Sequence, residues 1–227
     1  LKKDYKYVGV STTLCDWAYK NLPETKGIFK LSNIRIIENS KNSNFFKNQY
    51  KLKSKLNIIQ VSNVHPIKNI EHSVKIIYEI RKKMNVHLTI YGYKADVQYY
   101  KKLITLMESL GLRNSIDFVH DELDVPSILH EYHFGLYPSI SESGPLVLIE
   151  YLSKGLPFLT FNTGEVVKQL KERFPHFVIN NHDVNEWVER ILTLINKDND
   201  TEAMVQFYYN NFSEDKYFEN LISIYDQ

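Results

Sequence analysis

Two glutamates separated by seven residues, Glu142 and Glu150, are the side chains whose types and spacing most clearly suggest chemistry. Between them, Gly144-Pro145 precedes an apolar stretch that begins at Leu146. Proline suits the first helical position, glycine permits close approach, and the free N–H groups of a helix start bind anions such as a pyrophosphate. A carboxylate can accept two hydrogen bonds from a diol such as ribose. The segment therefore predicts a site for a ligand that carries both phosphate and sugar groups.

Solvent exposure is the alternative for both glutamates, with Glu142 on a loop and Glu150 on the polar face of a helix. Against it, Glu150 stands in an apolar run from Leu146 to Leu152, where an ionised group needs a partner. From Pro145 to Glu150 a helix rises only about 7–8 Å. We therefore expect both glutamates to reach one cleft.

The alternation of short apolar runs with helical stretches predicts how these residues are positioned. We expect strands at 5–10, 33–38, 56–61, 86–91, 116–119, 133–138, 156–161 and 177–180, with residues 39–53 as a linker. Helices are expected at 12–20, 70–83, 97–110, 125–130, 145–153, 166–173, 184–195 and 201–225, the last with a break near Asn210-Asn211. Such alternation is typical of an α/β fold, in which a Rossmann-like parallel sheet carries helices on both faces. Ligands then bind beyond the carboxyl ends of the strands, at residues 62–68, 92–94, 120–121, 139–146 and 162–165.

The composition is that of an ordinary globular protein, and it argues against two classes of function. With 227 residues, 24% of them charged, and a net charge of +1, the chain lacks the basic surplus of a nucleic-acid-binding protein. No apolar run approaches the ~18 residues that cross a membrane, and no signal peptide is visible. The single cysteine, Cys15, suits a reducing compartment. We therefore expect a cytoplasmic protein.

Motifs for metals and for other nucleotide sites are absent from the sequence. Asp198-Asn199-Asp200 has the Asp-x-Asp form of some metal sites, but it stands in a polar linker after a helix, so we reject it. The eight histidines show no zinc-site spacing, and neither a P-loop nor Gly-x-Gly-x-x-Gly occurs. We therefore expect neither a metal nor a cofactor.

The ordered set of segments resembles the donor-binding, C-terminal domain of the retaining glycosyltransferases of family four, which have the GT-B fold. The stretch from Glu142 to Glu150, followed by residues 153–157, resembles the family's Glu-x7-Glu motif and its Ala-x-Gly-x-Pro sequel. Residues 61–69 resemble its Val-Gly-Arg-x4-Lys-Gly loop, and Thr163-Gly164-Glu165 resembles the loop after the next strand. Also similar are a strand that ends in glycine (88–92), the strand before the base-binding loop (116–119), and the last pieces of the N-terminal domain (Ser11 and 36–39).

The resemblance implies a role for each candidate residue. Lys68 would contact the donor diphosphate and stabilise charge on the leaving group, and Glu142 would orient the transferred sugar, which makes these two the candidate catalytic residues. Donor-binding residues would be Glu150 on the ribose, Asn63, Gly144, Pro145 and Leu146 near the phosphates and sugar, and Val119 and His120 near the base. The alternative for Lys68 is a surface lysine beside a loop.

Four positions depart from the family's pattern. Asn63 replaces the arginine of the phosphate loop, so the loop has one positive charge fewer. Ser62 and Asn69 replace two glycines of the same loop, and Gly144 stands one position early in its motif. We therefore expect an altered hold on the donor phosphates in a site that keeps Lys68 and both glutamates.

The resemblance also implies the reaction: transfer of a hexose-type sugar from a nucleotide diphosphate to an acceptor hydroxyl, with retention, in polysaccharide or glycoconjugate synthesis. We expect a remnant of the N-terminal domain and a linker at 1–48, a nucleotide-sugar-binding domain at 49–210 and a tail helix at 211–227. The chain begins at Leu1 without methionine, so we expect a truncated protein that lacks most of its N-terminal domain. That domain would hold the carbohydrate or lipid-linked acceptor and contact the inner face of the membrane. The isolated chain should then bind the donor weakly and transfer little sugar.

Two other functions stay open. The chain could be a non-catalytic donor-binding subunit that pairs with a separate acceptor subunit, in which case its gene would begin near Leu1. It could also be a nucleotide-sugar epimerase with the GT-B fold, which would form its product without an acceptor.

Overall fold

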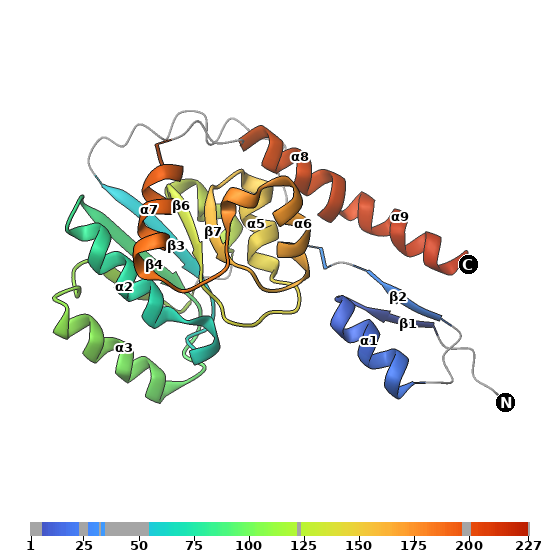
Figure 1. Ribbon diagram of the computed structural model, residues 1–227, viewed down its shortest axis with the longest axis horizontal. Coiled ribbons are helices and arrows are strands. Elements are labelled where there is room, and N and C mark those ends of the chain that lie inside the picture. Colours follow the sequence, from blue (N-terminus) through green and yellow to red (C-terminus); the bar gives the residue numbers. More distant parts are fainter. Residues whose placement is uncertain are drawn as a thin grey trace.

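A six-stranded parallel sheet forms the centre of the molecule (Figure 1). The computed structural model describes residues 6–22, 27–31, 33–34, 55–121, 124–196 and 201–226. The strands are β3 (Leu56–Val61), β4 (Val86–Tyr91), β5 (Ile116–Val119), β6 (Phe134–Tyr137), β7 (Phe158–Phe161) and β8 (Val178–Ile179). Their order is β5-β4-β3-β6-β7-β8, and every neighbouring pair is parallel. The predicted α/β fold is confirmed.

Helices connect the strands and cover both faces of the sheet. They are α2 (Ile70–Arg81), α3 (Val97–Ser109), α4 (Val125–Ile128), α5 (Leu146–Lys154), α6 (Glu165–Arg173), α7 (Val184–Leu194), α8 (Thr201–Phe212) and α9 (Glu214–Tyr225). α2 packs against α3 and α7, whereas α5 packs against α4 and α8. Because crossovers between parallel strands share one hand, connections that leave the middle of the sheet in opposite directions place their helices on opposite faces.

The core is built from strands that are covered on both sides. Leu56, Ile58 and Ile59 of β3 are completely buried, and so is Trp187 of α7. Continuous apolar runs of this kind are expected in a parallel sheet, since both faces carry helices. Gln60, a polar residue near the end of β3, is also buried and serves the site described below.

The direction of the strand order reverses between β3 and β6. The connections after β3 and β4 lead toward one edge of the sheet, and those after β6 and β7 lead toward the other. The loops after β3 and β6 therefore open on one crevice, which is where open α/β sheets bind their ligands.

A smaller N-terminal unit consists of β1 (Lys6–Gly9), α1 (Thr12–Asn21) and β2 (Gly27–Lys30). Its two strands are parallel and joined by the helix, which packs against both. Figure 1 shows this unit beside the main sheet, near the end of α9.

The position of β2 differs from the prediction, which placed a strand at 33–38. Asn33 and Ile34 are not in a strand, and residues 35–38, like the expected linker at 39–53, lie outside the described residues. The apolar part of β2 is only Ile28 and Phe29, too short a run to predict a strand. Pairing with β1 and packing under α1 establish it instead.

The two C-terminal helices run from the main sheet to the N-terminal unit (Figure 1). α8 packs on α5, and Lys6 Nζ of β1 donates to the carbonyl of Ile224 in α9 at 2.6 Å. The helix break falls at Ser213 and not at Asn210-Asn211, because the Ser213 hydroxyl accepts the N–H of Lys216 and caps α9. Within the described ranges, no helix combines the length and the apolar character needed to cross a membrane.

Candidate functional site

An ion pair joins the loops that follow β3 and β6. Lys68 Nζ lies 2.5 Å from Glu142 Oε1, and the Ser139 hydroxyl donates to the same carboxylate oxygen at 2.6 Å. Only 21% of the Lys68 side chain and 13% of the Glu142 side chain are exposed. The fold therefore brings both candidate catalytic residues together at the switch point of the sheet.

The buried ring of Tyr137 lies beside this pair. Its centroid is 5.9 Å from Lys68 Nζ. Burial, and after it the charge of Glu142, raises the pKa of the Tyr137 hydroxyl far above its usual range. Tyr137 therefore stays neutral: its hydroxyl hydrogen-bonds to the Glu142 carboxylate, and its buried ring shields the two charges from water.

Hydrogen bonds to one carbonyl hold the two loops against each other. The carbonyl of Ile67 accepts the N–H of Ile140 at 2.8 Å and the hydroxyl of Ser139 at 3.1 Å. Ile67 precedes Lys68, and Ser139 lies three residues before Glu142. The backbone that carries the two side chains of the ion pair is thus held in place.

The buried side chain of Gln60 holds the loop after β3 through hydrogen bonds. Its amide nitrogen donates to the carbonyl of Lys68 at 3.3 Å, and its amide oxygen accepts the hydroxyl of Ser73 at 2.6 Å. Gln60 was not among the predicted site residues, and Ser139 lay within the predicted ligand-binding segment 139–146 without an assigned role. A polar residue inside an otherwise apolar buried strand, which needs hydrogen-bond partners, was the available signal for Gln60.

Asn69 adopts the left-handed backbone conformation, with φ 51° and ψ 42°. It stands where the resembling family has glycine, directly after Lys68. Asparagine tolerates this conformation better than other residues with a side chain. The sequence change at this position therefore keeps the backbone shape of the loop.

The helix after β6 begins one residue later than predicted. Pro145 has φ −68° and ψ 113°, so it is the N-cap of α5, and Leu146 is the first helical residue. No side chain caps this end, so the N–H groups of the first turn, starting at Leu146, point out of the helix without an internal partner. An uncapped helix start of this kind is suited to an anion, and the predicted phosphate contact at Gly144, Pro145 and Leu146 stays a prediction.

Gly144 contacts Asn33, a residue that follows β2 of the N-terminal unit. Asn33 Nδ2 donates to the carbonyl of Gly144 at 2.8 Å. A Cβ atom on Gly144 would lie 2.9 Å from the same nitrogen. A side chain at position 144 would therefore displace Asn33.

The loop after β7 braces the segment that starts at Glu142. The N–H of Glu142 donates to the Thr163 hydroxyl at 3.1 Å, and the N–H of Glu165 donates to the carbonyl of Ser143 at 2.8 Å. Gly164 has φ 87°, and a Cβ atom there would lie 3.0 Å from Cδ of Pro145. The sequence Thr163-Gly164-Glu165 therefore shapes the site even where its side chains do not face a ligand.

Glu150 lies one turn into α5 and is 7% exposed. The burial of a carboxylate in this apolar helix matches the prediction that it does not stand on a solvated face. Burial, and after it the charge of Glu150, raises the pKa of Tyr151. Leu146, in the first turn of the same helix, is 41% exposed.

The remaining predicted residues gather around Gly92, one strand away from the ion pair. His120 Nδ1 lies 2.7 Å from the Gly92 carbonyl, and the carbonyl of Val119 accepts the Gly92 N–H at 3.0 Å. Gly92 has φ 150°, and a Cβ atom there would lie 2.2 Å from the Ser62 carbonyl oxygen and 3.0 Å from the N of Asn63. Val119, His120 and Asn63 therefore border one glycine at the carboxyl end of β4.

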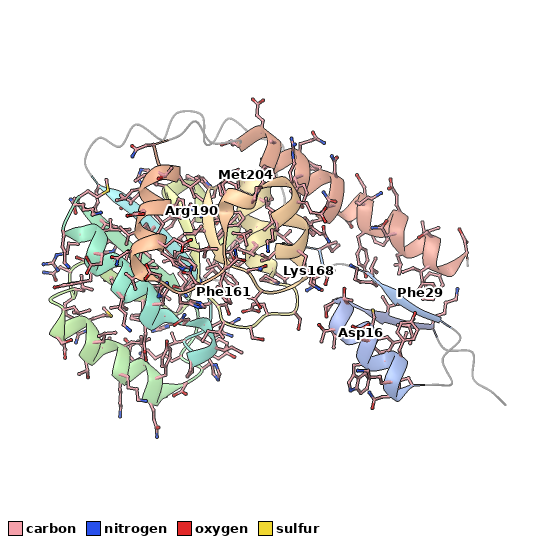
Figure 2. The ribbon with its side chains drawn as sticks, viewed as in Figure 1. Asp16, Phe29, Phe161, Lys168, Arg190 and Met204 are labelled. Atoms are coloured by element: carbon pink, nitrogen blue, oxygen red, sulfur yellow. The ribbon has the colours of Figure 1, made fainter. Side chains whose placement is uncertain are left out.

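Glu165 is a strongly held carboxylate that the sequence did not single out as a site residue. It accepts hydrogen bonds from Lys30 Nζ at 2.6 Å, Lys168 Nζ at 3.1 Å and the N–H of Thr12 at 3.3 Å. Burial alone would raise its pKa, but the hydrogen bonds from Lys30, Thr12 and Lys168 lower it to about 2. Figure 2 shows Lys168 on the side of α6 toward the N-terminal unit. Glu165 thus joins that unit to the site.

Among the residues that the structure describes, no three His, Cys, Asp or Glu side chains are grouped so that they could hold a metal ion. The rejected Asp198-Asn199-Asp200 segment lies outside the described residues.

The chain was compared with protein families and with individual proteins. Residues 41–225 match the model described as glycosyl transferases group 1. An uncharacterized glycosyltransferase of Haemophilus influenzae is 30% identical over 198 residues, which are 84% of this chain and 54% of the relative. The lipopolysaccharide glucosyltransferase WaaG of Escherichia coli is 25% identical over 138 residues, or 61% of this chain and 34% of WaaG. The chain spans about half the length of the first of these relatives and less of the second.

Solved structures share the fold at low sequence identity. The crystal structure of HepE from Anabaena in complex with UDP and glucose matches with a TM-score of 0.77 at 14% identity. The match covers 97% of this chain and 62% of HepE.

Proposed function

The chain belongs to the glycosyl transferases group 1 family, and on this basis we propose that it forms the donor-binding part of an enzyme that transfers a sugar from a nucleoside diphosphate to an acceptor hydroxyl. The observation that carries the proposal is the Lys68–Glu142 pair at the switch point of the sheet, next to the uncapped start of α5. One cation, one carboxylate and one helix N-terminus in a single crevice suit a diphosphate with a sugar attached.

Each group would contribute to transfer through its charge. Lys68 and the first-turn N–H groups of α5 would bind the diphosphate and stabilise the negative charge that grows on it as the sugar leaves. Glu142 would accept hydrogen bonds from the sugar hydroxyls and orient the sugar. Glu150 would accept hydrogen bonds from the ribose, and the backbone near Val119 and His120 would contact the base.

We further propose a hexose-type donor, retention of the anomeric configuration and transfer without a metal. A carbohydrate or lipid-linked acceptor and a role in polysaccharide or glycoconjugate synthesis belong to the same proposal. HepE, which has the same fold, was solved in complex with UDP and glucose, and this supports the hexose-type donor alone. Part of the acceptor site would lie in sequence beyond this chain, so the chain alone should transfer little sugar.

Glu150 provides the test of the donor site. In a thermal-shift screen, UDP-glucose, GDP-mannose and ADP-glucose are added to the chain with and without EDTA, and one should raise its melting temperature. In Glu150→Gln, that ligand should bind about tenfold more weakly, because a charged hydrogen bond of about 1.5–3 kcal/mol becomes a neutral one. Glu189→Gln, an exposed change on α7, is the matched control. Equal shifts in all three proteins would reject the ribose assignment.

The same ligand separates transfer from the other functions. Release of free sugar or its attachment to an added acceptor, followed by NMR, reports hydrolysis or transfer and the configuration of the product. An isomerised nucleotide sugar formed without acceptor would indicate an epimerase and contradict the proposal.

A further inference from the structure

We propose that the Lys68–Glu142 pair makes this site select nucleotide sugars over free nucleoside diphosphates. The inference rests on the proposed function and concerns what the two residues do when the ligand arrives. Glu142 holds Lys68 through the ion pair, and only a ligand that satisfies both side chains can separate them at low cost.

The pair occupies the place where a diphosphate needs its cation. Lys68 Nζ contacts a Glu142 oxygen at 2.5 Å, so a phosphate oxygen must take the position of that carboxylate oxygen to reach the same ammonium. Asn63 stands where the family has an arginine, so the loop has one cation fewer with which to attract the phosphates. Binding of a diphosphate therefore depends on Lys68 more than in a loop with both cations.

Loss of Lys68 leaves Glu142 in an unfavourable position. Its side chain is 13% exposed, and the groups that stay on the carboxylate are neutral hydroxyls, that of Ser139 at 2.6 Å and that of Tyr137. The N–H of Ile140 donates to the Ile67 carbonyl and the N–H of Glu142 donates to the Thr163 hydroxyl, so the backbone that carries Glu142 is held in this sheltered place. A carboxylate that is shielded from water and has lost its cation is strongly destabilised.

A sugar on the diphosphate removes this penalty, because its hydroxyls donate hydrogen bonds to the carboxylate. A free diphosphate lacks those hydroxyl donors, so its binding leaves the Glu142 carboxylate without its cation and without a replacement for it. After transfer, the product is such a free diphosphate, so Glu142 competes with it for Lys68 and favours its release. The pair thus discriminates between donor and product by the hydroxyl groups that only the donor carries.

Isothermal titration calorimetry of the whole chain tests the proposal. The probes are matched pairs of UDP with UDP-glucose, GDP with GDP-mannose and ADP with ADP-glucose, and the pair that binds is used further. In Glu142→Gln, the Kd of the free diphosphate should fall about fivefold to thirtyfold, because Lys68 is released from its charged partner. The Kd of the nucleotide sugar should fall less or rise, so the ratio of the two Kd values should shrink.

Two controls separate this mechanism from a general loss of negative charge. Glu172→Gln, an exposed change on α6, should leave both Kd values unchanged. In a Lys68→Met background, Glu142→Gln should no longer improve binding of the free diphosphate by more than about twofold, since the cation for which the two groups compete is gone.

The outcomes distinguish this inference from the proposed function. An equal gain for both ligands in Glu142→Gln, or an undiminished gain without Lys68, overturns the inference while donor binding still supports the proposed function. If neither member of any pair binds the unaltered chain or its variants, the proposed function fails and the inference falls with it.

Discussion

At the residue scale, the loop after β3 departs from the family's sequence pattern at Asn63 and Asn69, with different physical consequences. Asn69 replaces a glycine and adopts the same left-handed conformation that glycine favours, with φ 51°. Asn63 is a different kind of replacement. It stands where the family has an arginine, so it removes a positive charge and does not alter the conformations open to the backbone. The two replacements look alike in the sequence, but one preserves the geometry and the other changes the electrostatics.

Asn69 yields a prediction about stability. Asn69→Gly should change the free energy of unfolding by less than about 0.5 kcal/mol, because glycine adopts the left-handed conformation without strain. Asn69→Val should lower it by about 1–2 kcal/mol, since a β-branched residue is strained at positive φ. Urea unfolding followed by circular dichroism measures both. If the two variants are equally stable, the backbone account of Asn69 is wrong.

Residue roles were predictable to different degrees. Glu142 stood out through its spacing from Glu150 and its place after a strand, whereas Lys68 was named only through the resemblance of residues 61–69 to the family's phosphate loop. Ser139, whose hydroxyl holds Glu142, did not stand out, because serine is common in loops and its partner lies three residues away in a conformation that the sequence does not specify. The assigned roles of these residues in binding stay predictions.

At the element scale, close approach between loops restricts which residues can end a strand. Gly92 ends β4 where the loop after β3 passes over it, and a Cβ atom at position 92 would lie 2.2 Å from the Ser62 carbonyl oxygen. Gly111, which follows α3, also has a positive φ of 64°, but the nearest atom to its Cβ would be 3.9 Å away. Both glycines thus have a positive φ, but only Gly92 lacks room for a Cβ atom.

This difference predicts unequal effects of the same substitution. Gly111→Ala should cost about 1–2 kcal/mol of unfolding free energy, which is the cost of the left-handed conformation alone. Gly92→Ala should cost at least about 3 kcal/mol, because the loop with Ser62 and Asn63 must also move. Urea unfolding compares the two, and nucleotide binding should weaken only in Gly92→Ala. Equal losses would show that the contact with Ser62 is unimportant.

At the scale of the whole molecule, one carboxylate joins the N-terminal unit to the main sheet. The Glu165 carboxylate accepts hydrogen bonds from Thr12 and Lys30 of that unit and from Lys168 of its own helix. Its N–H also holds the carbonyl of Ser143. Glu165 therefore holds both the N-terminal unit and the segment that starts at Glu142.

The lowered pKa of Glu165 predicts a pH-dependent contribution to stability. Because its pKa falls from 4.5 in the unfolded chain to about 2 in the folded one, the contribution is fully present above about pH 4.5. It is lost as the pH falls toward 2. Glu165→Gln should cost about 2–3 kcal/mol at pH 7, somewhat less than the full shift because both lysines are partly exposed. The difference from the unaltered chain should shrink between pH 4.5 and 3.

Urea unfolding at several pH values measures this difference. Glu172→Gln, on the exposed face of the same helix, should show a small difference that does not change with pH. A gap between Glu165→Gln and the unaltered chain that stays constant down to pH 3 would contradict the assignment.

The C-terminal helices differ in how firmly they belong to the core. Met204 of α8 (labelled in Figure 2) is completely buried, whereas Phe218 of α9 is 49% exposed. Met204→Ala should therefore lower the free energy of unfolding by about 2–5 kcal/mol, and Phe218→Ala by less than about 1 kcal/mol. Chemical unfolding tests both, and a small effect at Met204 would mean that α8 is not part of the folded core.

The amino-acid sequence was enough to establish the class of fold, the order of most strands and helices, and the places of Glu142 in the loop after a strand and of Glu150 in the helix that follows. These properties follow from hydrophobic periodicity, which is local along the chain. Three-dimensional contacts were needed to establish that β2 forms at Gly27–Lys30, since it depends on pairing with β1. They also establish which groups meet: Lys68 and Glu142 are 74 residues apart, and Thr12 and Glu165 are 153 apart. Contacts over such separations depend on the complete fold, because the nearest neighbours of a charged group are set by how the loops pack and not by the residues beside it in the chain.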